Sequence, residues 1–164
     1  MRKVTRRTAS ALIGTTLFAT SSSLFAQPAG KPVKIGFSMA LSGGLAGGGK
    51  AALLTYQLWA EDVNKKGGLL GRPVELVYYD DQSSPATVPA IYSKLLDIDK
   101  VDLVISGYGT VPTAAAMPTI IEHKKLFPSL FALGLGEHFK YDRYFQIQPN
   151  GPNARIEISK GFYE

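Results

Sequence analysis

Short apolar runs alternate with longer segments of helical periodicity along most of this chain, and this alternation constrains its fold more than any other feature. The strand-like runs lie at 34–39, 72–79, 101–106, 126–132 and 143–148. Helices are expected at 50–66, 85–99 and 113–125, with a further helix after residue 152. The run at 101–106 is nearly all apolar, as in a parallel strand buried on both faces. The pattern predicts an α/β fold, a three-layer sandwich in which helices cover both faces of an open parallel sheet.

The residues also predict which side of the first helix faces the sheet and where the second helix begins. In the segment 50–66, one apolar stripe is formed by Ala51, Leu54, Leu58 and Val63, with Trp59 packed beside it. Ser84 is expected to be the N-cap of the next helix and Pro85 its first residue. The first helix should therefore turn its leucines towards the sheet.

The first 26 residues have the pattern of an export signal. A basic segment, 1–7, precedes a moderately apolar stretch that ends at Leu24-Phe25-Ala26, with a small residue at the cleavage edge. Threonines and serines interrupt this stretch, so it falls short of the roughly 20 apolar residues that a membrane-spanning helix needs. The sequence predicts a cleaved signal peptide at 1–26 and a periplasmic location, with the Sec and twin-arginine routes both open.

Charge and cysteine content exclude several classes of protein. The formal net charge is +5, but without residues 1–26 the balance is 14 basic against 13 acidic residues. No later stretch interleaves Lys and Arg with aromatic residues, which argues against a nucleic-acid partner. The absence of cysteine excludes disulfides, thiol catalysis and cysteine-ligated zinc.

Catalytic and metal-binding residues are not expected in this chain. His123 and His138 lie in different elements without metal-ligand spacing. Asp80 and Asp81 are adjacent in a strand and point to opposite faces, so they are predicted to be turn and helix-start residues rather than a catalytic pair. The sequence therefore predicts a protein that is not an enzyme and needs no cofactor and no metal.

Three glycine-rich loops follow predicted strands, at 42–49, 107–110 and 133–136. In open α/β sheets, ligands bind beyond the carboxyl ends of the strands, so these loops are the expected binding region. Thr110 is predicted either to cap the following helix or to cap it and also contact a ligand carboxylate. Gly109 exposes backbone N–H on the same side, and Tyr108 is placed to cover an apolar ligand.

The first of these loops resembles a phosphate-binding motif without completing it. Gly44-x-x-x-x-Gly49-Lys50 is followed by Ala51, which lacks the hydroxyl that holds magnesium. A dinucleotide version, 47–52, lacks an acidic residue about 20 positions further on. Glycines also let a ligand approach the backbone, and the helix end behind them favours a carboxylate. Ser42, Leu45 and Gly48 are therefore predicted to contact a solute rather than a nucleotide.

Three segments, "KIGFSMALSGGLAGGG", "WAEDVNKKGGLLGRPVELVYYDDQSSP" and "LVISGYGT", occur in an order and spacing that resemble the branched-chain amino-acid binding proteins of ABC transporters. These are type I periplasmic binding proteins, and the resemblance begins near Val33. It implies a two-lobed protein that captures a small amino acid or related carboxylate between its lobes. The protein would then deliver this solute to the membrane permease of the transporter.

The resemblance also implies a domain division and further site residues. Residues 27–148 would form the first lobe, and 149–164 the hinge crossing and the truncated start of the second, as in an N-terminal fragment or a truncated product. Thr110 matches the hydroxyl residue that binds the ligand's carboxylate. The segment that contacts the amino-acid head group is matched by Leu133, Gly134 and Leu135.

Two departures from the family pattern bear on the ligand. Leu135 stands where a hydroxyl residue is usual, and Gly48 stands where an aromatic residue often covers the ligand. We therefore expect a larger or less polar ligand, such as an aromatic or aliphatic carboxylate. Because one lobe forms only half a cleft, the chain alone is expected to bind weakly and to expose an apolar face.

Two other functions remain compatible with the sequence. A ligand-sensing ectodomain of a receptor uses the same fold and would be followed by a transmembrane segment and a signalling domain. A nucleotide-binding α/β enzyme would show metal-dependent binding of ATP or NAD.

Overall fold

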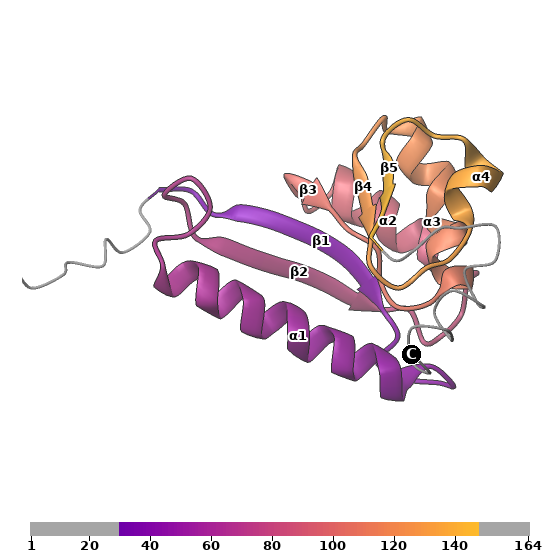
Figure 1. The fold of residues 1–164 in the computed structure, drawn as a ribbon, viewed down its shortest axis with the longest axis horizontal. Helices are drawn as coiled ribbons and strands as arrows, with labels where there is room; N and C mark the ends of the chain where they lie inside the picture. The colour runs from indigo at the N-terminus through magenta and orange to yellow at the C-terminus, as the bar shows by residue number, and fades with distance from the viewer. Residues whose placement is uncertain (1–29, 148–164) are drawn as a thin grey trace, which may run out of the picture.

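The computed structural model describes residues 30–147, in which strands and helices alternate (Figure 1). The predicted signal peptide and the helix expected after residue 152 lie outside these residues. The order is β1 (Val33–Met39), α1 (Ala46–Lys65), β2 (Val74–Asp80), α2 (Val88–Asp97), β3 (Leu103–Val104), α3 (Thr110–Glu122), β4 (Phe127–Ser129), α4 (Leu135–Phe139) and β5 (Tyr144–Gln146). Within 30–147, no helix is long and apolar enough to cross a membrane.

All strand pairs in the described residues are parallel, which confirms the predicted sheet type. β1 pairs with β2 along its whole length and with β3 at two positions, giving the order β2-β1-β3. β4 pairs with β5 in a second, two-stranded sheet. The two sheets are joined where Ser106 N–H donates to the Pro128 carbonyl at 3.0 Å and Tyr108 bridges to Phe131.

β3 is much shorter than the predicted strand at 101–106, and it is not buried on both faces. Leu103 is 45% exposed, while its neighbour Val104 is buried. Lys100 has a φ of 52°, and the Asp102 carboxylate accepts the Lys34 N–H at 2.9 Å. The residues before Leu103 therefore form a turn tied to β1, so the strand begins two residues later than predicted, and it ends at Val104 rather than at residue 106.

Helices cover β1 from both sides, because side chains alternate across a strand. Val33, Ile35, Phe37 and Met39 belong to the clusters that α1 covers. On the other face, a Cβ at Gly36 would lie 3.1 Å from Leu95 of α2, so α2 packs closely there. Figure 1 shows α1 running along β1 and β2, apart from α2, α3 and α4. The predicted three-layer arrangement is thus present.

The buried face of α1 differs from the predicted stripe, of which Val63 alone is half-buried against the core. The helix begins at Ala46, and its buried residues are Gly49, Ala52, Tyr56 and Ala60. Leu54 and Leu58 are 56% and 57% exposed, and Trp59 is 43% exposed. A Cβ at Gly49 would lie 1.9 Å from the Ala40 carbonyl oxygen, so the helix start lies directly against the end of β1. This close approach turns the small residues inward and the leucines outward.

The start of α2 also differs from the prediction. Its N-cap is Thr87, not Ser84, and Pro89 lies in the first turn. The Thr87 hydroxyl donates to the carbonyls of Asp81 at 2.8 Å and Ser84 at 2.9 Å. Residues 81–87 are therefore held in a turn that delays the helix.

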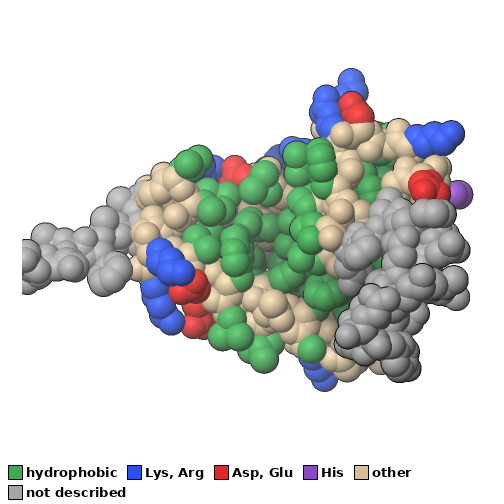
Figure 2. Space-filling view, viewed as in Figure 1, with side chains coloured by type: hydrophobic (Ala, Val, Ile, Leu, Met, Phe, Trp, Pro, Cys, Tyr) green, Lys and Arg blue, Asp and Glu red, His purple; other side chains and the backbone are tan. Residues whose placement is uncertain are grey.

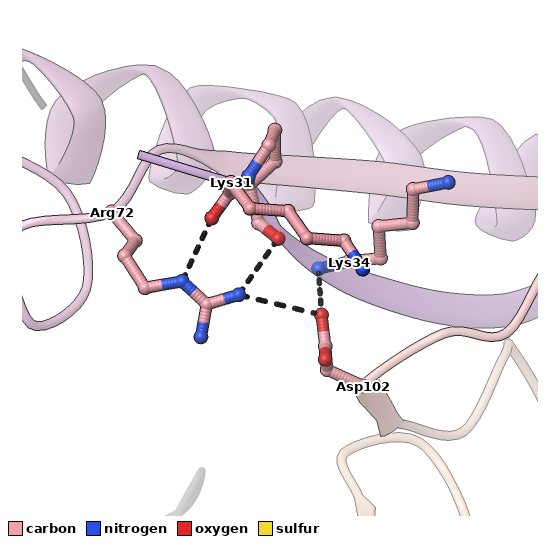
Figure 3. Close-up of polar contacts among 5 residues, drawn as sticks. Lys31, Lys34, Arg72 and Asp102 are labelled. Atoms are coloured by element: carbon pink, nitrogen blue, oxygen red, sulfur yellow. Dashed lines mark hydrogen bonds and ion pairs between the residues drawn. The ribbon is translucent and has the colours of Figure 1, made fainter. Parts of the chain in front are cut away.

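Arg72 ties together the amino ends of three strands (Figure 3). Its guanidinium donates to the carbonyls of Lys31 at 2.7 Å and Pro32 at 2.9 Å, and it lies 3.9 Å from the Asp102 carboxylate. Asp102 in turn binds the Lys34 amide. These contacts lie at the end of the sheet opposite to the expected binding loops.

Figure 2 shows hydrophobic side chains gathered over the middle of the face seen in Figure 1.

Candidate functional site

The first predicted loop is held by the turn that follows β2. One oxygen of Asp80, Oδ1, accepts N–H from Leu41 at 2.9 Å and from Ser42 at 3.2 Å, and Oδ2 accepts the Ser42 hydroxyl at 2.6 Å. The hydrogen bond from the Ser42 hydroxyl, followed by those from backbone amides, holds the pKa of Asp80 below its ordinary value. The Ser83 hydroxyl donates to the Ser42 carbonyl at 2.6 Å and accepts the Leu45 N–H at 3.0 Å.

The second loop places an aromatic ring on the first turn of α1. A Cβ at Gly48 would lie 2.2 Å from Cζ and 2.4 Å from the hydroxyl oxygen of Tyr108, so the ring occupies the space that a side chain there would need. The Tyr108 ring centroid lies 5.4 Å from that of Phe131. A Cβ at Gly109 would lie 3.4 Å from Leu45 Cδ1, and Gly109 has a φ of 101°. The predicted residues Leu45, Gly48, Tyr108 and Gly109 therefore lie together.

Thr110 links the second loop to the third, and it is not a helix cap. The N-cap of α3 is Gly109, which makes no side-chain capping bond, and Thr110 is the first helical residue. The Thr110 hydroxyl oxygen accepts the Leu133 N–H at 3.1 Å. Among residues 30–147, no group accepts the hydroxyl proton of Thr110. The two predicted roles, capping alone and capping together with a ligand contact, are therefore both wrong about the cap. A hydroxyl that accepts one hydrogen bond still has a proton of its own to donate.

The third loop leads into a short helix that sequence periodicity did not indicate. Gly134 is the N-cap of α4 and has a φ of 69°. Leu133 is half-buried, and Gly134 is exposed. Leu135 is buried among core residues of α2 and α3 rather than on the loop surface. A five-residue helix contains too few residues for a recognisable 3.6-residue repeat.

A layer of buried polar groups lies beneath these loops. The Tyr56 hydroxyl of α1 donates to the Ser106 carbonyl at 3.1 Å, and the Tyr92 hydroxyl of α2 donates to the Ile105 carbonyl at 2.7 Å. Burial raises the pKa of both tyrosines. Asp81 is fully buried, and burial raises its pKa more than the Ser83 amide and Ser38 hydroxyl lower it.

Sequence reasoning missed four residues that build this region: Asp80, Asp81, Ser83 and Phe131. It separated the two aspartates onto different faces, and the structure does so, with Asp80 exposed and Asp81 buried. It gave neither a role at the glycine loop. A signal was present, because a carboxylate at the end of β2 must lie beside the loop that follows the neighbouring parallel strand β1.

The site offers hydrogen-bond donors and apolar surface, and its first loop does not have the form of a phosphate loop. Residues 46–49 are helical, and the Tyr108 ring lies on Gly48. In the part of the chain that the structure describes, no group of three His, Asp or Glu residues is arranged to hold a metal ion. His123 contacts Asp97 at 3.2 Å, and the ring of His138 packs against that of Phe139 in α4. The arrangement can bind a small molecule and holds no evident set of reacting groups among these residues.

Comparison with known proteins gives consistent matches. A family model described as periplasmic binding protein matches residues 32–154. The branched-chain amino-acid transporter substrate-binding protein LivJ from Streptococcus pneumoniae, solved with isoleucine, is 29% identical over 73% of this chain and 34% of its own, with a TM-score of 0.68. The search of curated proteins gives no significant match.

Two further solved structures share the fold. A solute-binding protein of an ABC transporter from Rhodopseudomonas palustris, in complex with 3,4-dihydroxybenzoic acid, is 20% identical over 70% of this chain and 31% of its own, with a TM-score of 0.62. The leucine-binding protein LivK from Thermotoga maritima is 20% identical over 80% of this chain and 37% of its own, with a TM-score of 0.69. The chain spans about a third of the length of these proteins. With a family match over most of its length and the parallel α/β fold described above, the chain belongs to the periplasmic binding protein family.

Proposed function

We propose that this chain provides the first lobe of the solute-binding component of an ABC uptake transporter. The observation that carries the proposal is the meeting of the three loops at the carboxyl end of the sheet. Tyr108 lies on Gly48, Leu45 lies against Gly109, and Thr110 holds the Leu133 amide. Loops that converge on a rigid parallel sheet form the usual ligand site of such folds.

The chemistry of the loops favours a carboxylate with an apolar or aromatic body. The Thr110 hydroxyl has a proton to donate, and the α3 N-terminus behind it favours negative charge. Tyr108 and Leu45 supply partly exposed apolar surface beside these donors. The protein from S. pneumoniae is described with isoleucine, a carboxylate with an aliphatic body, and the protein from R. palustris with 3,4-dihydroxybenzoic acid, a carboxylate with an aromatic body.

The position of Tyr108 supports the less polar end of this ligand range. Gly48 leaves room for the Tyr108 ring, so an aromatic surface comes from the β3–α3 loop instead of from α1. The proposal includes closure of a second lobe over the ligand, delivery to a membrane permease, and export to the periplasm by a signal peptide at residues 1–26 that is then cleaved. It involves binding and closure without chemical conversion.

The direct test is calorimetric titration of the full-length protein with isoleucine, leucine, 3,4-dihydroxybenzoate and Mg-ATP. We expect one of the carboxylates to bind and Mg-ATP not to bind. Thr110→Ala should weaken that binding about tenfold, the value of one hydrogen bond to a charged group. Thr55→Ala is the matched control, because Thr55 is also on a helix but donates only within α1. Binding of Mg-ATP alone would contradict the proposal, as would equal effects of the two substitutions.

A further inference from the structure

We propose that Asp80 and Ser83 are positioning residues that hold loop 41–45 in its ligand-ready shape before any ligand arrives. The inference rests on the proposed function for its meaning, but the loop geometry that it explains is independent of which ligand binds. Asp80 is the last residue of β2 and Ser83 lies on the turn that follows it, so both are outside the three loops that meet around Tyr108 and Thr110.

The Asp80 carboxylate uses both oxygens on this loop. Oδ1 receives N–H groups from Leu41 and Ser42, and it also receives the Gln82 N–H of its own turn at 2.8 Å. Oδ2 receives the Ser42 hydroxyl at 2.6 Å. Hydrogen bonds to an ionised acceptor are about twice as strong as neutral ones. One side chain thus fixes two consecutive backbone amides at the point where the chain leaves β1.

Ser83 fixes the other end of the same loop. Its hydroxyl bridges the loop by donating to the Ser42 carbonyl and accepting the Leu45 N–H, at 2.6 and 3.0 Å. A Cβ at Gly43 would lie 2.5 Å from the Gln82 carbonyl oxygen, so the loop and the turn are in direct backbone contact. Leu45 is the N-cap residue of α1, so this bridge also sets where the helix begins.

The turn that carries these groups is itself held in an unusual conformation. Gln82 and Ser83 both have a φ of 58°, a left-handed conformation that non-glycine residues rarely adopt. Such strained residues persist only where their surroundings fix them, and they cluster at functional sites. Here the buried Asp81 carboxylate accepts the Ser83 N–H at 2.9 Å, and the Thr87 hydroxyl binds the Asp81 carbonyl.

The held loop leads directly to the candidate ligand surface. Leu45 lies against Gly109, and the first turn of α1 carries the Tyr108 ring on Gly48. If loop 41–45 moved, the start of α1 would move with it, and so would Gly48, on which the Tyr108 ring lies. Asp80 and Ser83 therefore act on the site through Ser42, Leu45 and the start of α1.

The test compares Asp80→Asn with Asp102→Asn in the full-length protein. Asp102 is a matched control because its carboxylate also accepts a backbone amide in the same sheet, but at the amino end. Amide hydrogen exchange is measured without ligand, and affinity is measured with isoleucine and with 3,4-dihydroxybenzoate. Ser83→Ala is the second variant, in case Asp80→Asn does not fold.

We expect Asp80→Asn to speed exchange at Leu41 and Ser42 about tenfold, as for loss of one charged hydrogen bond, and Ser83→Ala to do so at Leu45. Affinity for the bound carboxylate should fall by a similar factor. Asp102→Asn should leave both quantities unchanged, whatever it does to global stability. Unchanged loop exchange in both loop variants would overturn the inference, as would affinity losses no larger than that of Asp102→Asn. If the wild type binds neither carboxylate, the proposed ligand class is wrong, and exchange alone decides whether the loop is held.

Discussion

The ring of Tyr108 lies on the backbone of Gly48, in the space that any side chain at position 48 would occupy. Gly48 lies in the first turn of α1 and Tyr108 in the loop between β3 and α3, so the absence of a side chain in one segment sets the position of the ring in the other. Glycine at this position therefore makes room for a neighbouring side chain, although its own backbone is helical.

Gly48→Ala should displace the Tyr108 ring with little loss of stability, because the atoms that clash are the mobile end of a half-buried side chain. Alanine is favoured over glycine in a helix by up to about 1 kcal/mol, which offsets the cost of moving the ring. The control is Gly47→Ala, where a Cβ meets nothing within 4 Å. Ring NMR shifts of Tyr108 and ligand affinity should change only in the position-48 variant. An unchanged Tyr108 spectrum there would contradict the geometry.

Gly49→Ala should be strongly destabilising, in contrast to Gly47→Ala and Gly48→Ala. The added Cβ would meet the Ala40 carbonyl oxygen at 1.9 Å, and backbone cannot move aside as a side chain can. Forcing α1 away from β1 should lower the free energy of unfolding by about 1–3 kcal/mol, the range for overpacked cores. Urea unfolding of the variants at positions 47 and 49 measures this, and equal stabilities would show that α1 does not lie against β1 as described.

Tyr56→Phe and Tyr92→Phe should each lower the free energy of unfolding by about 1–3 kcal/mol, because each leaves a carbonyl at the end of β3 without its donor. The hydroxyls reach Ser106 and Ile105 from opposite faces of the sheet. Tyr141→Phe is the comparison, since its hydroxyl binds Lys125 at the far side of α3. We expect amide hydrogen exchange at Tyr108 to become faster in Tyr56→Phe and Tyr92→Phe and to stay unchanged in Tyr141→Phe.

Asp81→Asn tests the buried carboxyl through pH. Burial raises the pKa of Asp81 in the folded protein, so its contribution to stability is complete below the unfolded pKa of about 4 and is lost as pH rises through the folded value. The wild type should therefore lose stability relative to Asp81→Asn as pH rises from about 4. Asp80 is present in both proteins, so its opposite effect cancels. Urea unfolding at several pH values measures the difference in free energy of unfolding between the two proteins. A wild type that gained stability relative to Asp81→Asn as pH rises would refute the assignment.

The layered fold could be predicted because its signals are periodic. Apolar runs such as 34–39 alternate with helical segments, and the parallel sheet with helices on both sides follows from that order. The orientation of α1 could not be predicted in the same way. Its buried face is made of Gly49, Ala52, Tyr56 and Ala60, whereas the larger leucines are outside. The close approach of α1 to β1 favours glycine and alanine on the buried face. Choosing the face with the most large apolar side chains therefore selects the wrong side of the helix.

The site shows a similar division. The meeting of the glycine loops could be predicted, because the carboxyl ends of parallel strands lie at one edge of a sheet. The role of Thr110 could not, since a cap and a loop-to-loop bond use the same hydroxyl, and the partner, the Leu133 amide, is 23 residues away. Asp80 was missed although its place at the end of β2, beside the end of β1, was a usable signal. Ser83 could not be found in this way, because its bonds depend on the left-handed turn at residues 82 and 83, which nothing in the local sequence indicates.

The Arg72 contacts have a practical consequence for how this protein can be handled. They fix the segment at Lys31 and Pro32 to the amino end of the sheet, whereas the loops around Tyr108 lie at the carboxyl end. β1 runs between the two ends for seven residues, which corresponds to about 20 Å at about 3.3 Å per residue. A surface linker attached just before Lys31 would therefore start from the end of the sheet opposite to the candidate site, and it would leave the loops around Tyr108 facing away from the support.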